Sequence, residues 1–157
     1  MKKKYFQRLI VLGGLTLGML ATTTSCSSDD DAGNGWEVVN GDISVAVGTY
    51  KGTLYYRSYS HIPDIDQYEF YDAILLVTRN GENRIEVKAK SGETYSIITP
   101  KTLQVESYSY NGKTHVDSVI GEVNGSFSYY PDSQSIYVST ERTGETELNF
   151  TFEGVKQ

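Results

Sequence analysis

Short segments in which apolar and polar residues alternate run through the chain from about residue 48 to its end. In residues 84–90 every second side chain is apolar, and Leu148, Phe150 and Phe152 repeat the pattern near the C-terminus. A period of two is that of a β-strand with one buried face and one wet face. No stretch shows a helical period of persuasive length, so the domain is predicted to be all-β.

Other segments extend this pattern. The residues predicted to share an inward face are Tyr50, Leu54 and Tyr56 in one strand, and Val123, Phe127 and Tyr129 in another. Residues 73–77 are apolar on both faces, as expected for a central or doubly covered strand. These segments together predict a sheet with one well-defined hydrophobic side.

Turn signals separate the strands at short intervals. Asn80-Gly81 and Asn111-Gly112 are the strongest, because both central positions of a type I′ turn need positive φ. Pro131-Asp132 and Thr143-Gly144 are weaker signals of the same kind. Strands joined by hairpins form an antiparallel meander. Since a flat meander leaves two open edges, we expect an up-and-down barrel, with a two-sheet β-sandwich as the alternative.

Two segments carry a family resemblance. Residues 48–54, Gly-Thr-Tyr-Lys-Gly-Thr-Leu, and residues 150–156, Phe-Thr-Phe-Glu-Gly-Val-Lys, resemble the first and last strands of small bacterial lipocalin-like (calycin-like) lipoproteins. The resemblance implies a barrel of about eight strands over roughly residues 45–156. It carries no residue-level ligand site.

The N-terminal region is typical of an export signal. Four basic residues precede a mostly apolar run over residues 9–21, and small residues lead from there into Cys26. The run is shorter than the ~20 residues that a membrane-spanning helix needs. The pattern resembles a bacterial lipoprotein signal, which is cut just before a lipidated cysteine. It predicts a signal peptide over residues 1–25, a flexible acidic tether over 26–41 and one β domain over 42–157.

Cys26 is the only cysteine in the chain, so it has no intramolecular disulfide partner. We expect it to carry the lipid that attaches the protein to a membrane. The alternatives are a free thiol and an intermolecular disulfide. The tract Ser27-Ser28-Asp29-Asp30-Asp31 resembles a signal for the outer face of the outer membrane in one group of Gram-negative bacteria, and it would also serve as a solvated spacer.

Charge argues against one class of partner. The whole chain has a net charge of −6. Cleavage before Cys26 would remove the four basic residues of the leader and no acidic residue. The mature protein would therefore keep 10 basic and 20 acidic residues. This surface repels phosphate backbones, so no nucleic-acid partner is expected.

Residues for chemistry are sparse. His61 and His115 are far apart in sequence and lack accompanying zinc ligands, and no nucleophile elbow or phosphate loop is present. Neither an enzyme activity nor a cofactor is therefore expected. Asp64, Asp66 and Glu69 could offer oxygens to calcium, but their spacing matches no complete calcium loop, and an acidic surface loop is the preferred interpretation.

The predicted ligand-binding residues lie in one strand. Tyr108 and Tyr110 share a face with Gln104 and Glu106, whereas Leu103 would lie on the core side. Tyrosine rings stack on apolar faces and their hydroxyls hydrogen-bond, which suits a sugar or a peptide. A bulge after Glu106 would instead turn both tyrosines into the mouth of the barrel.

These observations predict a surface-anchored, non-catalytic binding module for a small molecule, a glycan or a peptide. The alternative is a structural or accessory envelope lipoprotein that contacts other envelope proteins and has a filled barrel. An interior cavity of ~300 Å³ or more would favour binding inside the barrel, and a packed interior would favour the alternative.

Overall fold

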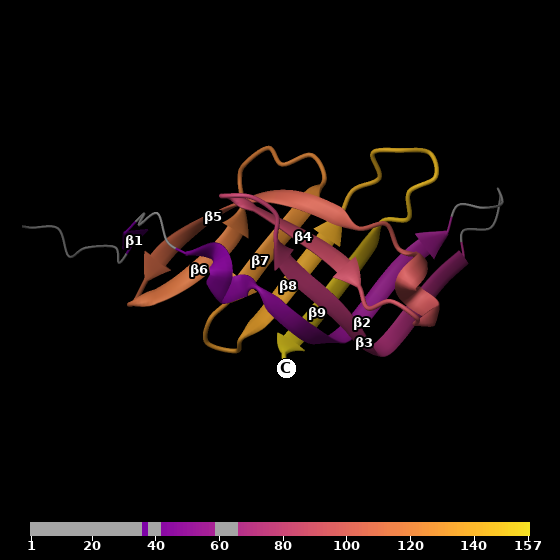
Figure 1. The fold of residues 1–157 in the computed structure, drawn as a ribbon, viewed down its shortest axis with the longest axis horizontal. Coiled ribbons are helices and arrows are strands. Elements are labelled where there is room, and N and C mark those ends of the chain that lie inside the picture. The colour runs from indigo at the N-terminus through magenta and orange to yellow at the C-terminus, as the bar shows by residue number, and fades with distance from the viewer. Residues whose placement is uncertain (1–35, 38–41, 59–65) are drawn as a thin grey trace, which may run out of the picture. The chain divides into compact units, whose positions relative to one another are not determined.

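A computed structural model describes residues 36–37, 42–58 and 66–157 (Figure 1). The predicted signal peptide, Cys26 and most of the tether lie outside these residues, as do His61 and Asp64. In the described part of the chain eight long antiparallel strands follow one another. Their bounds are β2 Gly48–Ser58, β3 Asp66–Arg79, β4 Arg84–Ala89, β5 Lys101–Tyr110, β6 Lys113–Ser118, β7 Gly125–Tyr130, β8 Ser135–Thr140 and β9 Phe150–Lys156.

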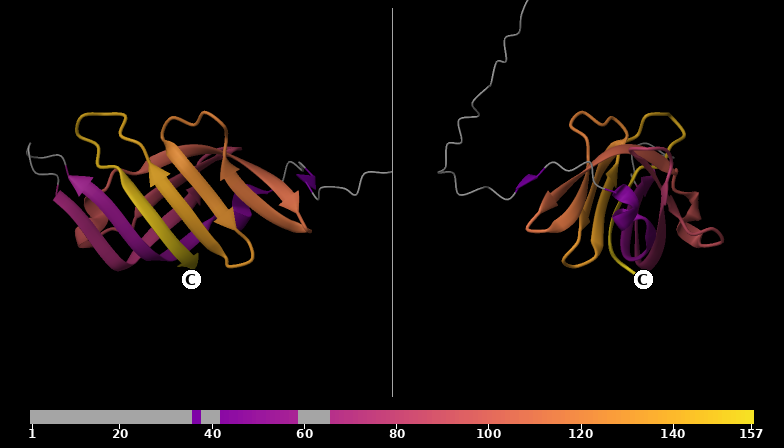
Figure 2. Two further views of the ribbon diagram at one scale, coloured as in Figure 1. Left: turned by 180° about the vertical axis from the view of Figure 1, so that it is seen from behind. Right: turned by 60° about the vertical axis from the view of Figure 1, so that its left-hand side comes forward.

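The eight strands form a closed barrel. Each pairs with its neighbour in sequence, and β2 also pairs with β9, which therefore lies between β2 and β8 (Figure 2). The predicted barrel is confirmed over the two-sheet sandwich. The segments that resemble the first and last lipocalin-like strands are the ones that meet at this closure, where Tyr50 pairs with Lys156 and Gly52 with Gly154.

A short strand, β1 (Trp36–Glu37), adds to the outside of this arrangement. Its backbone pairs with the end of β5, with Trp36 opposite Tyr110 and Glu37 opposite Ser109. Two residues of the predicted tether are therefore hydrogen-bonded to the barrel.

The interior of the barrel is filled by side chains. The inward residues of the predicted strands are buried as expected, among them Tyr50, Leu54, Phe127 and Phe152. One assignment was wrong: Val123 is 71% exposed, because β7 begins only at Gly125 and Val123 belongs to the preceding loop.

A single 3-10 turn, η1 (Ile43–Ala46), lies across one opening of the barrel (Figure 2, right). Ile43 and Ala46 are buried in the core, and the turn contacts β3, β5 and β6. The hydroxyl of Tyr50 donates a hydrogen bond to the Ala46 carbonyl at 2.8 Å, which holds the turn in place. The turn η1 therefore packs its apolar residues onto the core at this end of the barrel.

The strand β3 carries a bulge near Asp72. Gly52 pairs with Ala73 while Leu54 pairs with Phe70, so β3 has one extra residue in this interval, and Asp72 has a φ of 62°. The bulge lets residues on both of its sides keep an inward face. Beyond it Ala73, Leu75 and Val77 are buried, whereas Ile74 and Leu76 on the other face are half-buried, so the expected double cover of residues 73–77 is incomplete.

The two strongest turn predictions have different outcomes. Asn111 and Gly112 both have positive φ, 50° and 71°, and join β5 to β6 as a two-residue turn, so that prediction is confirmed. The type I′ prediction at Asn80-Gly81 was wrong, because β3 and β4 are joined by four residues, 80–83, and only Gly81 has positive φ there. The Asn80 N–H instead closes a wider turn by donating to the Arg84 carbonyl.

A second 3-10 turn, η2 (Thr94–Ile97), follows β4 and brings Tyr95 against β3. The Ile74 N–H donates to the Tyr95 hydroxyl at 2.9 Å, beyond the last residue that pairs with β4. Tyr95 is buried with the core cluster. In the described part of the chain no helix has the length and apolar character needed to cross a membrane.

Candidate functional site

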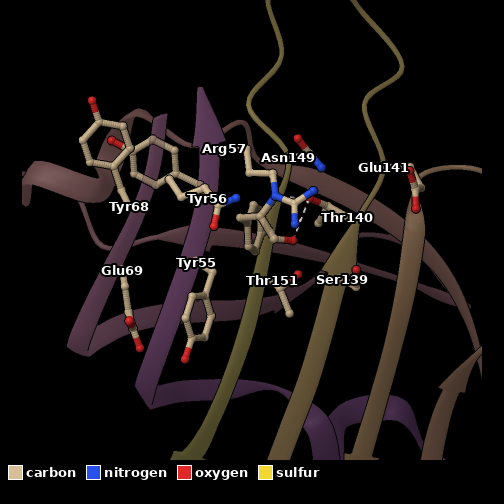
Figure 3. Close-up of a pocket in the computed structure, with 12 residues that line it drawn as sticks. Tyr55, Tyr56, Arg57, Tyr68, Glu69, Ser139, Thr140, Glu141, Asn149 and Thr151 are labelled. Atoms are coloured by element: carbon tan, nitrogen blue, oxygen red, sulfur yellow. Dashed lines mark hydrogen bonds between the residues drawn. The ribbon is translucent and has the colours of Figure 1, made fainter. Parts of the chain in front are cut away.

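One depression lies where the ends of β2, β3, β8 and β9 meet, and we name it the rim pocket (Figure 3). Its volume is about 540 Å³, within the range usual for small-ligand sites. It is lined by Tyr55, Tyr56, Arg57, Gln67, Tyr68, Glu69, Ser139, Thr140, Glu141, Asn149, Phe150 and Thr151.

Strand alternation explains how one pocket is both aromatic and polar. Tyr56, Thr140 and Phe150 are buried inward residues at the ends of their strands, whereas Tyr55 and Glu69 are exposed on the outer wall. The rim pocket therefore spans the edge of the barrel, with rings on its inner side and hydrogen-bonding groups on its outer side.

A ladder of rings forms the inner side of the rim. Tyr56 stacks on Tyr68 with centroids 4.8 Å apart and on Phe70 with centroids 5.9 Å apart. Tyr95 packs at a tilt on Phe70, which ties the ladder to η2. Because each ring packs on the next, the rings at the rim form one continuous aromatic surface.

Two polar groups at the rim pocket lack partners inside the described ranges 36–37, 42–58 and 66–157. No hydrogen bond or ion pair there engages the guanidinium of Arg57. The side-chain oxygen Oδ1 of Asn149 is buried and accepts no hydrogen bond. Buried polar atoms are nearly always paired, so an orphan acceptor beside a pocket indicates a missing donor. Both residues lie at the upper rim in Figure 3.

The position of Asn149 depends on a tie between β8 and β9. The Thr140 hydroxyl accepts from the Phe150 N–H at 2.8 Å and donates to the Phe150 carbonyl at 3.1 Å. Thr140 and Phe150 are the last and first residues of these strands, so the tie fixes where the loop over residues 141–149 leaves the barrel. That loop supplies Glu141 and Asn149 to the rim pocket.

Glu69 lies near two tyrosines on the outer wall. A hydrogen bond to its carboxylate is the largest cause that raises the pKa of Tyr55, and the same is true of Tyr71. Tyr71 is 71% exposed and Tyr55 is 47% exposed. Two solvent-facing phenols therefore share the field of one carboxylate.

The tyrosines predicted to bind ligand lie on the outer face of β5. Leu103, Val105 and Ser107 are buried, and the alternation continues without a bulge, so Tyr108 and Tyr110 point outward as predicted. They cover the neighbouring strand: Tyr108 stacks on His115 with centroids 5.2 Å apart, and Tyr110 meets the edge of the same ring. Burial, followed by a hydrogen bond with Asp117, raises the pKa of Tyr108 to about 12.

Gln104 and Glu106 share that outer face, but the four predicted residues do not converge on one pocket. Gln104 lies in a separate groove of about 560 Å³, which we name the wall groove. It is lined by Arg84, Thr102, Gln104 and the loop Val119–Asn124. Tyr110 is six residues from Gln104, about 20 Å along an extended strand. Ligand binding by these four residues stays a prediction.

The Glu122 carboxylate shapes the wall groove from within its loop. It accepts hydrogen bonds from the backbone N–H groups of Gln104 at 2.7 Å and Asn124 at 2.8 Å. Partial burial favours a higher pKa for Glu122, but these backbone hydrogen bonds outweigh it and lower the pKa. The carboxylate is thus used to hold the loop on β5.

Metal binding is not visible in the described residues, where no group of three or more His, Cys, Asp or Glu side chains could hold an ion. Asp64, which the calcium interpretation requires, lies outside them. Glu69 is engaged with the two tyrosines described above.

The rim pocket was missed by the sequence analysis. The signal that could have found it is the tyrosine-rich pair of segments around Tyr55, Tyr56 and Tyr68, Tyr71, which the barrel joins to residues about 85 positions later. Comparison of the chain with known protein families, with characterised proteins and with solved structures gave no match.

Proposed function

We propose that this chain is a lipid-anchored, lipocalin-like binding protein of the bacterial outer membrane, facing the cell exterior, which holds a polar ligand in the rim pocket. The observation that carries the binding proposal is a stacked set of rings beside the exposed Arg57 and the buried acceptor Asn149 Oδ1, neither of which has a partner among the described residues. A ligand with hydroxyl or amide groups would satisfy both, since Arg57 donates and Asn149 Oδ1 accepts.

We assign the site to binding and not to catalysis. The described lining of the rim pocket has two carboxylates, Glu69 and Glu141, and no histidine, cysteine or lysine to act with them. The proposal therefore includes no step of bond making or breaking.

The anchor is supported by the sequence around Cys26. Metabolic labelling with a radioactive fatty acid should mark the wild-type chain and leave Cys26→Ser unlabelled, as an uncleaved or soluble precursor. Protease digestion of intact cells should remove the barrel if it faces outward. A Cys26→Ser chain that is processed normally and partitions into detergent would contradict the anchor.

Ligand binding is tested on the full mature chain in detergent, screened by calorimetry against glycans, peptides and small polar molecules. For any ligand found, Arg57→Ala should weaken binding about tenfold or more, because a hydrogen bond to a charged group is lost. Arg84→Ala is the matched control, since Arg84 is an exposed arginine of the wall groove.

A ligand whose affinity is unchanged by Arg57→Ala but falls with Tyr108→Ala and Tyr110→Ala would place the site on β5 and overturn the rim assignment. The second candidate function, a structural or accessory envelope lipoprotein, is favoured by the filled interior of the barrel. It predicts that the screen yields no ligand, while cross-linking in cells joins the chain to another envelope protein.

A further inference from the structure

We infer that the ligand of the rim pocket is a neutral, linear glycan, which leaves the pocket and runs down the outer wall of the barrel across Tyr55 and Tyr71. The inference rests on the proposed function, because it needs the rim pocket to bind a ligand. It adds the chemical class of that ligand, its charge and the track along which it lies.

The pocket and the wall share residues. Tyr55 of β2 pairs directly with Glu69 of β3 and, on its other side, with Thr151 of β9. All three line the rim pocket, and all three point outward from the barrel. The polar side of the pocket is therefore the first row of the outer wall, with no ridge of backbone between them (Figure 3).

The wall continues this chemistry beyond the pocket. The next outward row places Thr53 beside Glu153, and Glu153 beside Tyr137 of β8. Rows on one face are two residues apart, about 6.6 Å along a strand. Tyr71 lies on the same side, beside Glu69, and is the most exposed tyrosine in the described part of the chain. Rings thus alternate with carboxylates and hydroxyls along the track.

Two rings of the track are open to a ligand. Tyr55 is 47% exposed and Tyr71 is 71% exposed, and both lie near the Glu69 carboxylate, which raises the pKa of each phenol. The exposed face of such a ring suits the apolar face of a sugar, while the neighbouring carboxylates accept from sugar hydroxyls.

Charge selects against anionic glycans. The rim pocket and the track contain Glu69, Glu141 and Glu153 against one cation without an ion-pair partner in the described residues, Arg57. The nearby Lys51 is paired with Asp72 at 3.1 Å. Closely spaced like charges repel, so uronic-acid or sulfated chains are disfavoured.

Most of the sheet under the track offers no edge to a peptide. An extended peptide is usually recognised by adding a strand to an open sheet edge. The strands β2, β9 and β8 are each paired on both sides, whereas residues 66–73 of β3 pair with β2 alone. Recognition over the three fully paired strands must therefore use side chains, which favours a ligand rich in hydroxyls and flat apolar faces. A peptide that adds to the edge of β3 is the competing outcome of the test below.

The test is a length series measured by calorimetry on the full mature chain. The probes are neutral mono-, di-, tetra- and hexasaccharides of glucose, mannose, galactose and xylose, and galacturonic acid chains of matched length. We expect affinity to rise about tenfold or more from the disaccharide to the hexasaccharide of at least one series, as each further ring finds a partner. Tyr71→Ala should remove this gain and leave disaccharide binding within about twofold. Tyr71→Phe, which keeps the ring, should retain most of it.

Tyr130→Ala is the matched control, since Tyr130 is about as exposed as Tyr55 but belongs to β7. Affinity that does not grow with length, or a gain that survives Tyr71→Ala, would overturn the track. Uronic chains that bind as tightly as neutral ones would overturn the charge assignment. If no saccharide binds but another ligand binds in an Arg57-dependent manner, the inference fails and the proposed function stands. If nothing binds, both fail.

Discussion

Gly52 of β2 lies directly opposite Gly154 of β9, at the seam where the first and last strands of the barrel meet. Both positions face the interior, between Tyr50 and Leu54 on one strand and beside Phe152 on the other. The ring of Phe152 and the backbone of the facing strand occupy the space that side chains would need. A glycine pair at this seam therefore lets the barrel close around an aromatic ring.

Gly52→Ala should destabilise the barrel by about 1–3 kcal/mol or more, as overpacking does. A Cβ at Gly52 would lie well inside 3.0 Å of the Glu153 carbonyl oxygen, which is backbone and cannot move aside alone. Urea unfolding followed by circular dichroism measures the change. Thr53→Ala, at the adjacent outward position, is the control and should cost less than about 1 kcal/mol. Equal stability of Gly52→Ala and wild type would contradict the crowded seam.

Phe150→Ala should lower the free energy of unfolding by ~3–5 kcal/mol. Phe150 is 2% exposed and pairs with Tyr56 at the inner side of the rim, so truncation leaves a cavity in the core. The outward neighbour Thr151 provides the control, and Thr151→Ala should change stability by no more than about 0.5 kcal/mol. A loss under about 1 kcal/mol for Phe150→Ala would mean that the inner face of β9 is wrongly assigned.

Stability should fall in acid partly through Glu147. The ammonium of the buried Lys101 lies 2.7 Å from Glu147 Oε2, and this hydrogen bond, followed by those from Thr143, lowers the pKa of Glu147 from 4.5 to about 2. A depressed pKa stabilises the folded state above the unfolded value, and the contribution is lost as pH falls from about 4.5 toward 2. Across this range the free energy of unfolding should depend more steeply on pH for the wild type than for Glu147→Gln.

The same residue links stability to the rim pocket, because Glu147 lies in the loop that supplies Glu141 and Asn149. Its carboxylate also accepts from the N–H groups of Thr143 and Gly144. Glu145, an exposed carboxylate of the same loop, offers the control variant Glu145→Gln. Identical pH dependence of wild type and Glu147→Gln would rule out a stabilising role for the Lys101 contact.

Tyr108 should ionise near pH 12 instead of 10. Burial is the larger cause and the hydrogen bond with Asp117 the next. A raised tyrosine pKa means that the neutral ring stabilises the fold, an effect present below about pH 10 and lost as pH rises toward 12. Ring-carbon NMR titration measures it, with Tyr108→Phe to assign the signal. Asp117→Asn should lower the pKa of Tyr108. A pKa near 10 for Tyr108 in the wild type would contradict the packed environment.

The strands and their inner faces were predictable from sequence because alternation is a local property. Phe150, Leu54 and Val87 could be placed inside from their immediate neighbours alone, since side chains on a strand alternate whatever the strand pairs with. The wrong predictions concern residues at the ends of strands, because the local pattern does not show where a strand begins or stops. Val123 has the right parity for the core but precedes β7, and Asn80-Gly81 has the turn dipeptide but sits in a four-residue connection.

The rim pocket was decided by tertiary structure. Tyr55, Glu69 and Thr151 become neighbours only because β9 returns to pair with β2, and the register of that closure sets which side chains share a row. The bulge near Asp72 then returns the following residues of β3, Ala73 and Leu75, to the interior. The sequence predicts which face of its strand each residue occupies. Which residues meet on that face depends on the closure and register of the whole barrel, and these are set by packing between strands far apart in the chain.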